Sequence, residues 1–302
     1  MNQIKLKIIT PVFNGFRFIP TYFDALENLE IPDGIKLSLV IVDNGSTDGS
    51  LMLINEFLKK DCFKFLNGII LSYTEISSSY AARNFGVNYS ESDYYIFTDI
   101  DCKIHKDYVN KLNETIMSKS FDIIGGDVKI FTKKVPNFYE IYDLIFGFNM
   151  KSYESEDTGI TANLVVSNDC FRNVNGFDPY ISGADRNFCK KAKKKGFNFF
   201  FSESIIVDHP ARDSFNDLYN KTIRIANGKS MYLRNRSIGF IVKVFMKNLL
   251  SSIIQIHQFK MLYARRHIYS KLKVFDKIKL FLFSFYLGAM GRLQINYRIL
   301  IN

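Results

Sequence analysis

Strand-like and helix-like segments alternate through the first two hundred residues, and this alternation limits the fold more than any other feature. Runs rich in β-branched and aromatic residues predict strands at residues 6–10, 37–42, 68–73, 94–98 and 122–131. Helix-like stretches separate them at residues 22–30, 51–60, 80–88 and 108–118. Further on, we expect strands at 161–166 and 198–207 and a helix at 185–195 that ends at Gly196. Such alternation predicts an α/β fold, in which helices flank a mostly parallel sheet.

Polar clusters follow three of the predicted strands. They are Thr10-Pro11-Val12-Phe13-Asn14-Gly15, Asp43-Asn44-Gly45-Ser46-Thr47-Asp48-Gly49 and Asp99-Ile100-Asp101. Open α/β sheets bind ligands outside the carboxyl ends of their strands. The sequence therefore predicts a binding site at this edge of the sheet.

The Asp99-Ile100-Asp101 segment indicates a metal site. Because a strand points alternate side chains the same way, the two carboxylates at its end project from one face and repel each other unless a cation lies between them. Mg²⁺ and Mn²⁺ prefer oxygen ligands and can link carboxylates to substrate phosphates. This predicts a metal-dependent site for a phosphate-bearing ligand; the alternative is a pair of solvated or helix-capping carboxylates.

Charge is distributed unevenly along the 302 residues, whose net charge is +10. Residues 209–302 hold 17 Lys+Arg and 3 Asp+Glu, a net +14, which leaves −4 for residues 1–208. A basic segment of this kind predicts an anionic partner, either a membrane surface or nucleic acid. No motif for binding RNA or DNA accompanies it, so nucleic acid is not expected.

Two apolar stretches in the basic segment are poor candidates for membrane spans. Residues 238–256 are interrupted by Lys243, Lys247, Asn248 and Gln255, and residues 280–290 are shorter than the roughly 20 residues that a span needs. Helices with this composition are typical of an anionic membrane interface. The alternative is an ordinary helical subdomain packed on the sheet.

The cysteines and the N-terminus indicate the compartment. Cys62, Cys102, Cys170 and Cys189 lack the spacing of a zinc site, and we expect free thiols in a reducing cytoplasm. The first residues show no apolar region typical of a signal peptide. With the basic segment, this predicts a cytoplasmic protein held peripherally on the inner face of the cell membrane.

Taken in order, the motifs resemble those of family 2 glycosyltransferases with the GT-A fold. Beside the clusters above, they are Ala82-Arg83-Asn84-Phe85-Gly86-Val87, Thr161-Ala162-Asn163-Leu164, Val174-Asn175-Gly176-Phe177-Asp178 and Gly183-Ala184-Asp185-Arg186-Asn187-Phe188. The resemblance implies a Rossmann-like GT-A domain over residues 1–210. The charge and composition of residues 211–302 predict a basic amphipathic helical extension that either lies at a membrane interface or packs on the domain. It also implies inverting, metal-dependent transfer of a hexosyl or N-acetylhexosaminyl group from a nucleotide-sugar, with UDP the most frequent carrier. The acceptor would be a hydroxyl of a glycan or lipid-linked glycan in cell-surface polysaccharide synthesis.

The resemblance also implies residue roles. The residues that would contact the nucleotide-sugar are Thr10, Pro11, Asn14, Asp43, Arg83, Asn84 and Asp99. Asp99, Asp101 and His209 would hold Mg²⁺ or Mn²⁺, Asp185 would be the general base, and Asn163 and Asp178 would contact the sugar or acceptor. Local structure offers alternatives: a turn cap for Asp43, a surface ion pair for Arg83, a helix N-cap for Asp185, a surface imidazole for His209 and a turn for Asp178.

One motif departs from the family pattern. Ala184 stands where a Glu usually precedes the base, and Asn187 stands where a later carboxylate often lies. A degenerate GT-A protein that acts as a binding partner is therefore an alternative. A nucleotidyltransferase is disfavoured because the first strand is not followed by a glycine-rich loop with Arg and Lys, and the absence of Gly-x-Gly-x-x-Gly there argues against a dehydrogenase.

Overall fold

The computed structural model describes residues 3–179, 182–233, 236–253 and 255–301, with all their side chains except those of residues 64, 65 and 253. Ile254, within the predicted apolar stretch 238–256, lies outside the described residues. The chain divides into two compact units. The sheet unit comprises Met1–Lys129, Met150–Pro179 and Ala184–His209, and the helical unit comprises Ile130–Asn149, Tyr180–Gly183 and Pro210–Asn302. The predicted boundary at residue 210 stays a prediction; residues 130–149, which it placed in the first domain, group with the helical unit.

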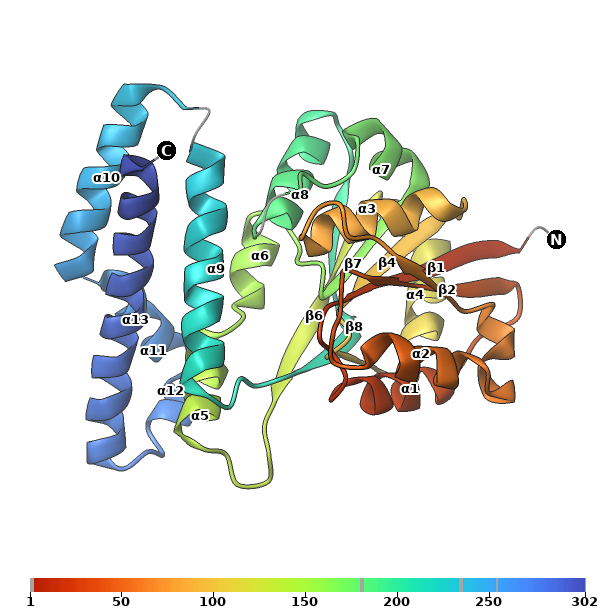
Figure 1. Ribbon diagram of the computed structural model, residues 1–302, viewed down its shortest axis with the longest axis horizontal. Coiled ribbons are helices and arrows are strands. Elements are labelled where there is room, and N and C mark those ends of the chain that lie inside the picture. Colours follow the sequence, from red (N-terminus) through yellow and green to blue (C-terminus); the bar gives the residue numbers. More distant parts are fainter. Residues whose placement is uncertain (1–2, 180–181, 234–235, 254, 302) are drawn as a thin grey trace. The chain divides into compact units, whose positions relative to one another are not determined.

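The strands form an eight-stranded sheet in the order β3-β2-β1-β4-β7-β6-β8-β5 (Figure 1). Their bounds are β1 Ile4–Val12, β2 Ile35–Asp43, β3 Ile69–Ser72, β4 Tyr94–Thr98, β5 Lys103–Ile104, β6 Ile123–Phe131, β7 Asn163–Ser167 and β8 Phe199–Pro210. Pairing is parallel from β3 to β4, whereas β7 runs antiparallel to both β4 and β6, and β5 runs antiparallel to β8. The predicted α/β sheet is confirmed, and the parallel half brings the ends of β1, β2 and β4 to one edge.

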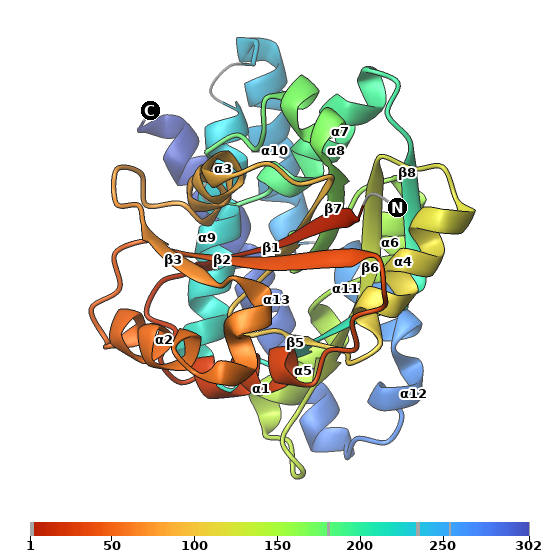
Figure 2. The same cartoon turned by 90° about the vertical axis from the view of Figure 1, so that its right-hand side faces the viewer.

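Helices cover both faces of the parallel half (Figure 2). The helices of the sheet unit are α1 Ile19–Glu27, α2 Ser50–Leu58, α3 Ser79–Tyr89, α4 Tyr108–Ser118, α6 Met150–Ser155, α7 Asn168–Val174 and α8 Ala184–Lys194, with a 3-10 turn at Asp61–Leu66. Helix α3 lies on one face and α1 and α2 on the other. Ser78 caps α3, since its hydroxyl accepts from the N–H groups of Tyr80 and Ala81. A Cβ at Gly86 would lie 3.0 Å from Ile9 and Val42, so this glycine lets α3 approach β1 and β2 closely.

An aromatic cluster fixes α7 and α8 to the sheet. Phe97 on β4, Phe171 on α7, Phe188 on α8 and Phe177 between the two helices lie with ring centroids 4.9–5.7 Å apart. All four are buried. Aromatic packing of this kind adds to the burial of apolar area, and here it sets the position of the first turn of α8.

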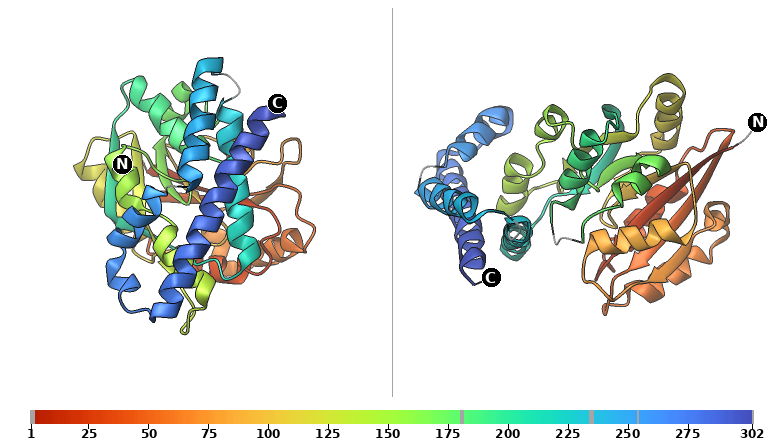
Figure 3. Two further views of the ribbon diagram at one scale, coloured as in Figure 1. Left: turned by 90° about the vertical axis from the view of Figure 1, so that its left-hand side faces the viewer. Right: turned by 90° about the horizontal axis from the view of Figure 1, so that it is seen from above.

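The helical unit holds α5 Phe138–Phe146, α9 Phe215–Leu233, α10 Ile238–Ile253, α11 Ile256–Ala264, α12 Arg266–Tyr269 and α13 Val274–Leu300. Helix α13 packs along α9 and α10 (Figure 3). Among the described residues, no single helix is both long and apolar enough to cross a membrane, although Ile238–Ser252 and Ile256–Ala264, bent by 62°, pass that test as a pair.

A buried ionic group ties α5 to α9. The carboxylate of Asp143, 1% exposed, contacts Arg212 Nη1 at 3.0 Å and Lys221 Nζ at 3.1 Å. Burial alone would raise the pKa of Asp143, but the cations of Lys221 and Arg212 lower it to about 2. Burial and Arg212 in turn lower the pKa of Lys221 to about 8. The lowered pKa of Asp143 means that the fold favours its charged form, whereas the lowered pKa of Lys221 means that the fold disfavours its charged form. We take the ionic group to stabilise the fold, because two cations compensate the single charge of Asp143.

Candidate functional site

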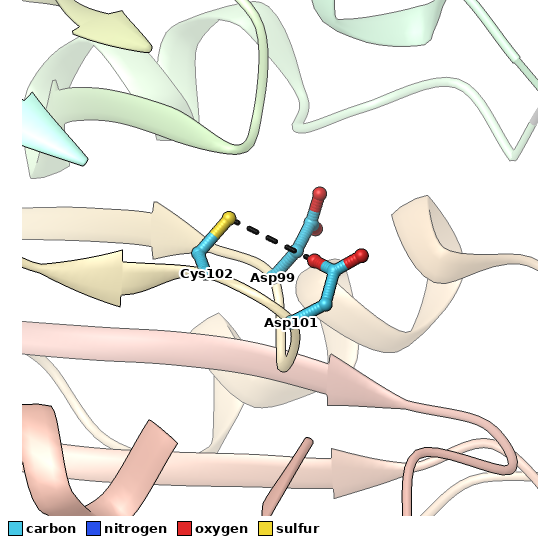
Figure 4. A group of neighbouring side chains, drawn as sticks. All are labelled: Asp99, Asp101 and Cys102. Carbon is cyan, nitrogen blue, oxygen red and sulfur yellow. Dashed lines mark hydrogen bonds between the residues drawn. The ribbon is translucent and has the colours of Figure 1, made fainter. Parts of the chain in front are cut away.

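The two aspartates after β4 converge through a turn, not through strand alternation. The strand ends at Thr98, and Cys102 N–H donates to the Asp99 carbonyl at 3.0 Å, which closes the turn. One ligand atom each from Asp99, Asp101 and Cys102 lies within 4.8 Å of the others (Figure 4). The prediction that strand alternation brings the two carboxylates together was therefore wrong, because β4 ends before Asp99. The carboxylates nevertheless lie close to each other.

The donor set around this turn fits a hard divalent cation. His209, at the end of β8, places Nε2 3.4 Å from an Asp101 carboxylate oxygen, so this predicted ligand adjoins the cluster through Asp101. Burial raises the pKa of Cys102 well above its usual range, and its thiol lies 3.8 Å from an Asp101 carboxylate oxygen. The carboxylates of Asp99 and Asp101 supply the oxygen ligands that hard divalent cations prefer.

Arg83 contacts this turn through Asp99, and its side chain is buried. Its guanidinium on α3 pairs with the Asp99 carboxylate, and the side chain is only 2% exposed. Nε of Arg83 is a buried atom without a hydrogen-bond partner among the described residues. The surface ion pair considered from the sequence is therefore wrong, and the buried Arg83 side chain holds the Asp99 carboxylate in position.

Asp185 occupies the first turn of α8 and is 8% exposed. Its carboxylate accepts hydrogen bonds from the N–H groups of Arg186 at 2.8 Å and Thr161 at 3.2 Å. Burial raises the pKa of Asp185, while these two donors and the Arg83 charge act in the opposite direction. A partly desolvated carboxylate held in this way is suited to accept a proton.

Sequence reasoning missed Tyr80. Its side chain is buried, hydrogen-bonds to Asp185 and packs against the guanidinium of Arg83, whose central carbon lies 5.6 Å from the ring centroid. The only signal was its spacing: Tyr80 precedes Arg83 by three residues, which places both on one face of a helix.

Asp43 and Asn14 organise the loops after β2 and β1. Asp43, 3% exposed, accepts from the N–H groups of Gly45 at 3.2 Å and Ser46 at 3.2 Å, so its turn-capping role is confirmed. Asn14 has a positive φ of 51° and joins the two loops, because its side-chain oxygen accepts from Thr47 N–H at 2.8 Å. These hydrogen bonds hold the two loops together.

Three residues predicted to contact the nucleotide lie within the packed structure. Thr10 is fully buried and bonds to the Tyr22 hydroxyl at 2.6 Å. Pro11 is buried within β1. The Asn84 amide donates to the Phe177 carbonyl at 2.7 Å and accepts from its N–H at 2.9 Å. Their side chains position β1 and the turn after α7.

The two predicted acceptor residues are also engaged internally. Asn163, 1% exposed, accepts from the Tyr108 hydroxyl at 2.8 Å and donates to the carbonyls of Asp127 at 2.8 Å and Ile205 at 2.9 Å. Asp178 pairs with Lys191 at 2.6 Å and accepts from Asn187. Asn163 therefore links α4, β6 and β8, and Asp178 ties its turn to α8. Contact with an acceptor stays a prediction for both residues.

Comparison with known proteins shows which family this chain belongs to and which solved structures share its fold. The sequence pattern described as glycosyl transferase family 2 matches residues 7–172. Glycosyltransferase AglE of Haloferax volcanii is 31% identical over 226 residues, which cover 74% of this chain and 72% of AglE. The fold is similar to the mannosyltransferase PcManGT from Pyrobaculum calidifontis in complex with GDP-Man and Mn²⁺, at TM-score 0.62 and 12% identity over 99% of this chain and 86% of that one. It is also similar to S. aureus TarS 1-349 in complex with UDP-GlcNAc, at TM-score 0.54 and 15% identity over 98% and 89% of the two chains.

Proposed function

The chain belongs to glycosyl transferase family 2 and has the GT-A fold, and from this premise we propose that it is an inverting, metal-dependent transferase of a hexosyl or N-acetylhexosaminyl group from a UDP-sugar. One observation carries the proposal. The turn after β4 and the end of β8 gather Asp99, Asp101 and His209 at the carboxyl edge of the sheet. This is the edge at which α/β sheets bind their ligands.

The metal would be Mg²⁺ or Mn²⁺, held by Asp99, Asp101 and His209. Bound there, such an ion neutralises negative charge on the departing nucleoside diphosphate. The solved neighbours support a nucleotide-sugar donor, since one contains GDP-Man with Mn²⁺ and another contains UDP-GlcNAc. Asp43 would accept a hydrogen bond from the base, because its carboxylate is an acceptor at the end of β2. The loop that Asn14 organises would border the base.

Asp185 would be the general base. The acceptor oxygen attacks the anomeric carbon, the bond from that carbon to the diphosphate oxygen breaks, and the hydroxyl proton passes to the Asp185 carboxylate. The N–H groups of Arg186 and Thr161 and the Tyr80 hydroxyl hold the carboxylate in place, so it does not have to reorient before it accepts the proton. Its burial makes it more basic than an exposed aspartate.

We further propose that the acceptor is a hydroxyl of a glycan or lipid-linked glycan in cell-surface polysaccharide synthesis. The net +14 of residues 209–302 supports a place on the cytoplasmic face of an anionic membrane, where a lipid-linked acceptor would be within reach.

One observation favours the alternative of a degenerate GT-A protein that only binds a partner. Ala184 supplies no carboxylate beside Asp185, and Asn187 is engaged with Asp178. Asp185 nevertheless keeps its position and hydrogen bonds, which favours a catalytic protein.

Isothermal titration calorimetry of UDP, GDP and dTDP, each with and without Mn²⁺, tests the proposal. We expect Mn²⁺-dependent binding of UDP, lost in Asp101→Ala and retained in Asp24→Ala, a matched change of an exposed aspartate on α1. Binding of GDP or dTDP instead would change the donor class. Failure of the folded protein to bind any nucleotide would refute the proposal and favour the partner-binding alternative.

A further inference from the structure

Helix α10 leaves a row of apolar side chains exposed. Along one side of the helix, Ile238, Val242, Met246, Leu249 and Leu250 are 80%, 54%, 52%, 39% and 65% exposed. Residues spaced by three and four lie on one face of a helix, so these five form one stripe, the α10 stripe. Exposed apolar residues that form a contiguous patch mark an interaction surface.

The opposite side of α10 carries polar contacts to α13. The Asn248 amide donates to Asn296 Oδ1 at 2.9 Å, and the Asn296 amide donates to the Phe245 carbonyl at 3.2 Å. Asn296 is 4% exposed. A helix in water normally turns its apolar face inward. Helix α10 does so with Val244, which packs against the buried cluster of Ala226, Leu233 and Ile295, and yet it leaves the α10 stripe exposed as a second apolar face. This arrangement suits a helix whose outer surroundings are apolar.

The charges around the stripe indicate what those surroundings are. Residues 218–275 contain 12 Lys+Arg and no Asp or Glu. Lys243 and Lys247 are exposed and each follows a residue of the stripe. A symmetric contact between two copies would bring these cations together, because the same patch meets itself. An anionic lipid surface would attract them, at a gain of about fivefold in binding for each lysine.

We infer that the α10 stripe is the part of this protein that inserts into the interface of an anionic membrane, with Lys243 and Lys247 at the level of the lipid phosphates. The inference rests on the membrane placement proposed above and names the face that makes it. Helix α10 lies along the interface, since one side of it remains packed on α13. Insertion of the stripe adds burial of apolar area to the electrostatic attraction.

The composition of the chain allows a direct test. The protein contains no tryptophan, so a single introduced tryptophan is the only one to report. Full-length Met246→Trp carries it in the stripe, and full-length Met117→Trp is the control, because Met117 is a 75% exposed methionine on α4 in the sheet unit. The probes are vesicles of phosphatidylcholine, with and without phosphatidylglycerol, and with brominated acyl chains for quenching.

We expect vesicles containing phosphatidylglycerol to shift the Met246→Trp emission to the blue and brominated lipid to quench it, with neither effect in Met117→Trp. In the otherwise unchanged sequence, Val242→Ser with Leu250→Ser should weaken vesicle binding about tenfold for each side chain. Lys243→Gln with Lys247→Gln should weaken it about fivefold for each lysine. Circular dichroism of each variant confirms that it is folded.

Three results would overturn the inference. Vesicle binding without a blue shift at residue 246 would show that another face makes the contact, although the membrane placement would stand. A blue shift without vesicles that grows with protein concentration would identify a second copy as the occupant. A protein that ignores anionic vesicles yet keeps Mn²⁺-dependent UDP binding would lose the membrane placement and the inference together, while its transferase function would stand.

Discussion

Replacing Gly126 by alanine should destabilise the sheet unit through Asn163. Gly126 lies on β6, and a Cβ added there would meet Nδ2, Cγ and Oδ1 of Asn163 at 2.2, 2.5 and 2.6 Å. These distances are far below van der Waals contact, so the Asn163 amide must move. Because its surroundings are close-packed, the movement breaks the three hydrogen bonds that the amide makes.

The magnitude follows from those bonds. Each contributes about 1 kcal/mol net, and more when the partner left behind is buried, as the Tyr108 hydroxyl is. Asn163→Ala should therefore cost about 3 kcal/mol, and Gly126→Ala about 3–5 kcal/mol because the displaced amide must also be accommodated. Once Asn163 is alanine, the new methyl at residue 126 no longer meets the amide. The double variant should then cost only about 3 kcal/mol, well below the sum of the single changes.

Urea unfolding followed by circular dichroism, performed on the wild type, both single variants and the double variant, measures this cycle. Thermal unfolding should show losses of roughly 6–12 °C for a 3 kcal/mol change. Additive single effects would refute the contact between the two positions. If Asn163→Ala instead raised KM for an acceptor without changing stability, the residue would be a substrate contact as first predicted, and its structural role would be wrong.

Two other changes test the site and the helical unit. Asp185→Asn should lower kcat by about 10²–10⁴-fold while UDP binding is retained. In the wild type, kcat should fall as the pH decreases, because the base must be ionised. Burial raises the pKa of Asp185, so this fall should be centred above the usual pKa of an aspartate. A wild-type kcat that is insensitive to acid in a stable protein would remove Asp185 as the base. Because Asp143 has its pKa lowered to about 2, its ionised form stabilises the fold above pH of about 4, and this contribution is lost as pH falls towards 2. The Asp143→Asn variant should therefore be less stable than the wild type at neutral pH, and its melting temperature should change less as the pH is lowered. Equal stability of the variant and the wild type at pH 7 would contradict a stabilising ionic group.

The sequence alone was sufficient for the fold class, and it predicted the edge of the sheet at which the candidate site lies. Local periodicity reports which segments are strands and helices, and parallel strands must bring the motifs at their carboxyl ends to one edge. This argument predicted a binding site beside Asp43 and Asp99-Ile100-Asp101, whereas the roles of Asp43 and His209 were implied by the resemblance to the family, which the family comparison then supported.

The tertiary structure decided how individual side chains are used. Asn163 and Thr10 stand in motifs that resemble binding motifs, yet packing between strands buries them and gives their polar atoms internal partners. Tyr80 was missed because its contact with Asp185 spans more than a hundred residues of chain.

The same distinction applies to the C-terminal helices. Their basic charge is a sum over the sequence and could be counted directly. The sequence alone did not show which side of α10 is exposed, because that depends on the contact between Asn248 on α10 and Asn296 on α13, which are nearly fifty residues apart in the chain. Composition and periodicity are local properties that the chain carries in any conformation, whereas burial and hydrogen-bond partners exist only once distant segments pack together.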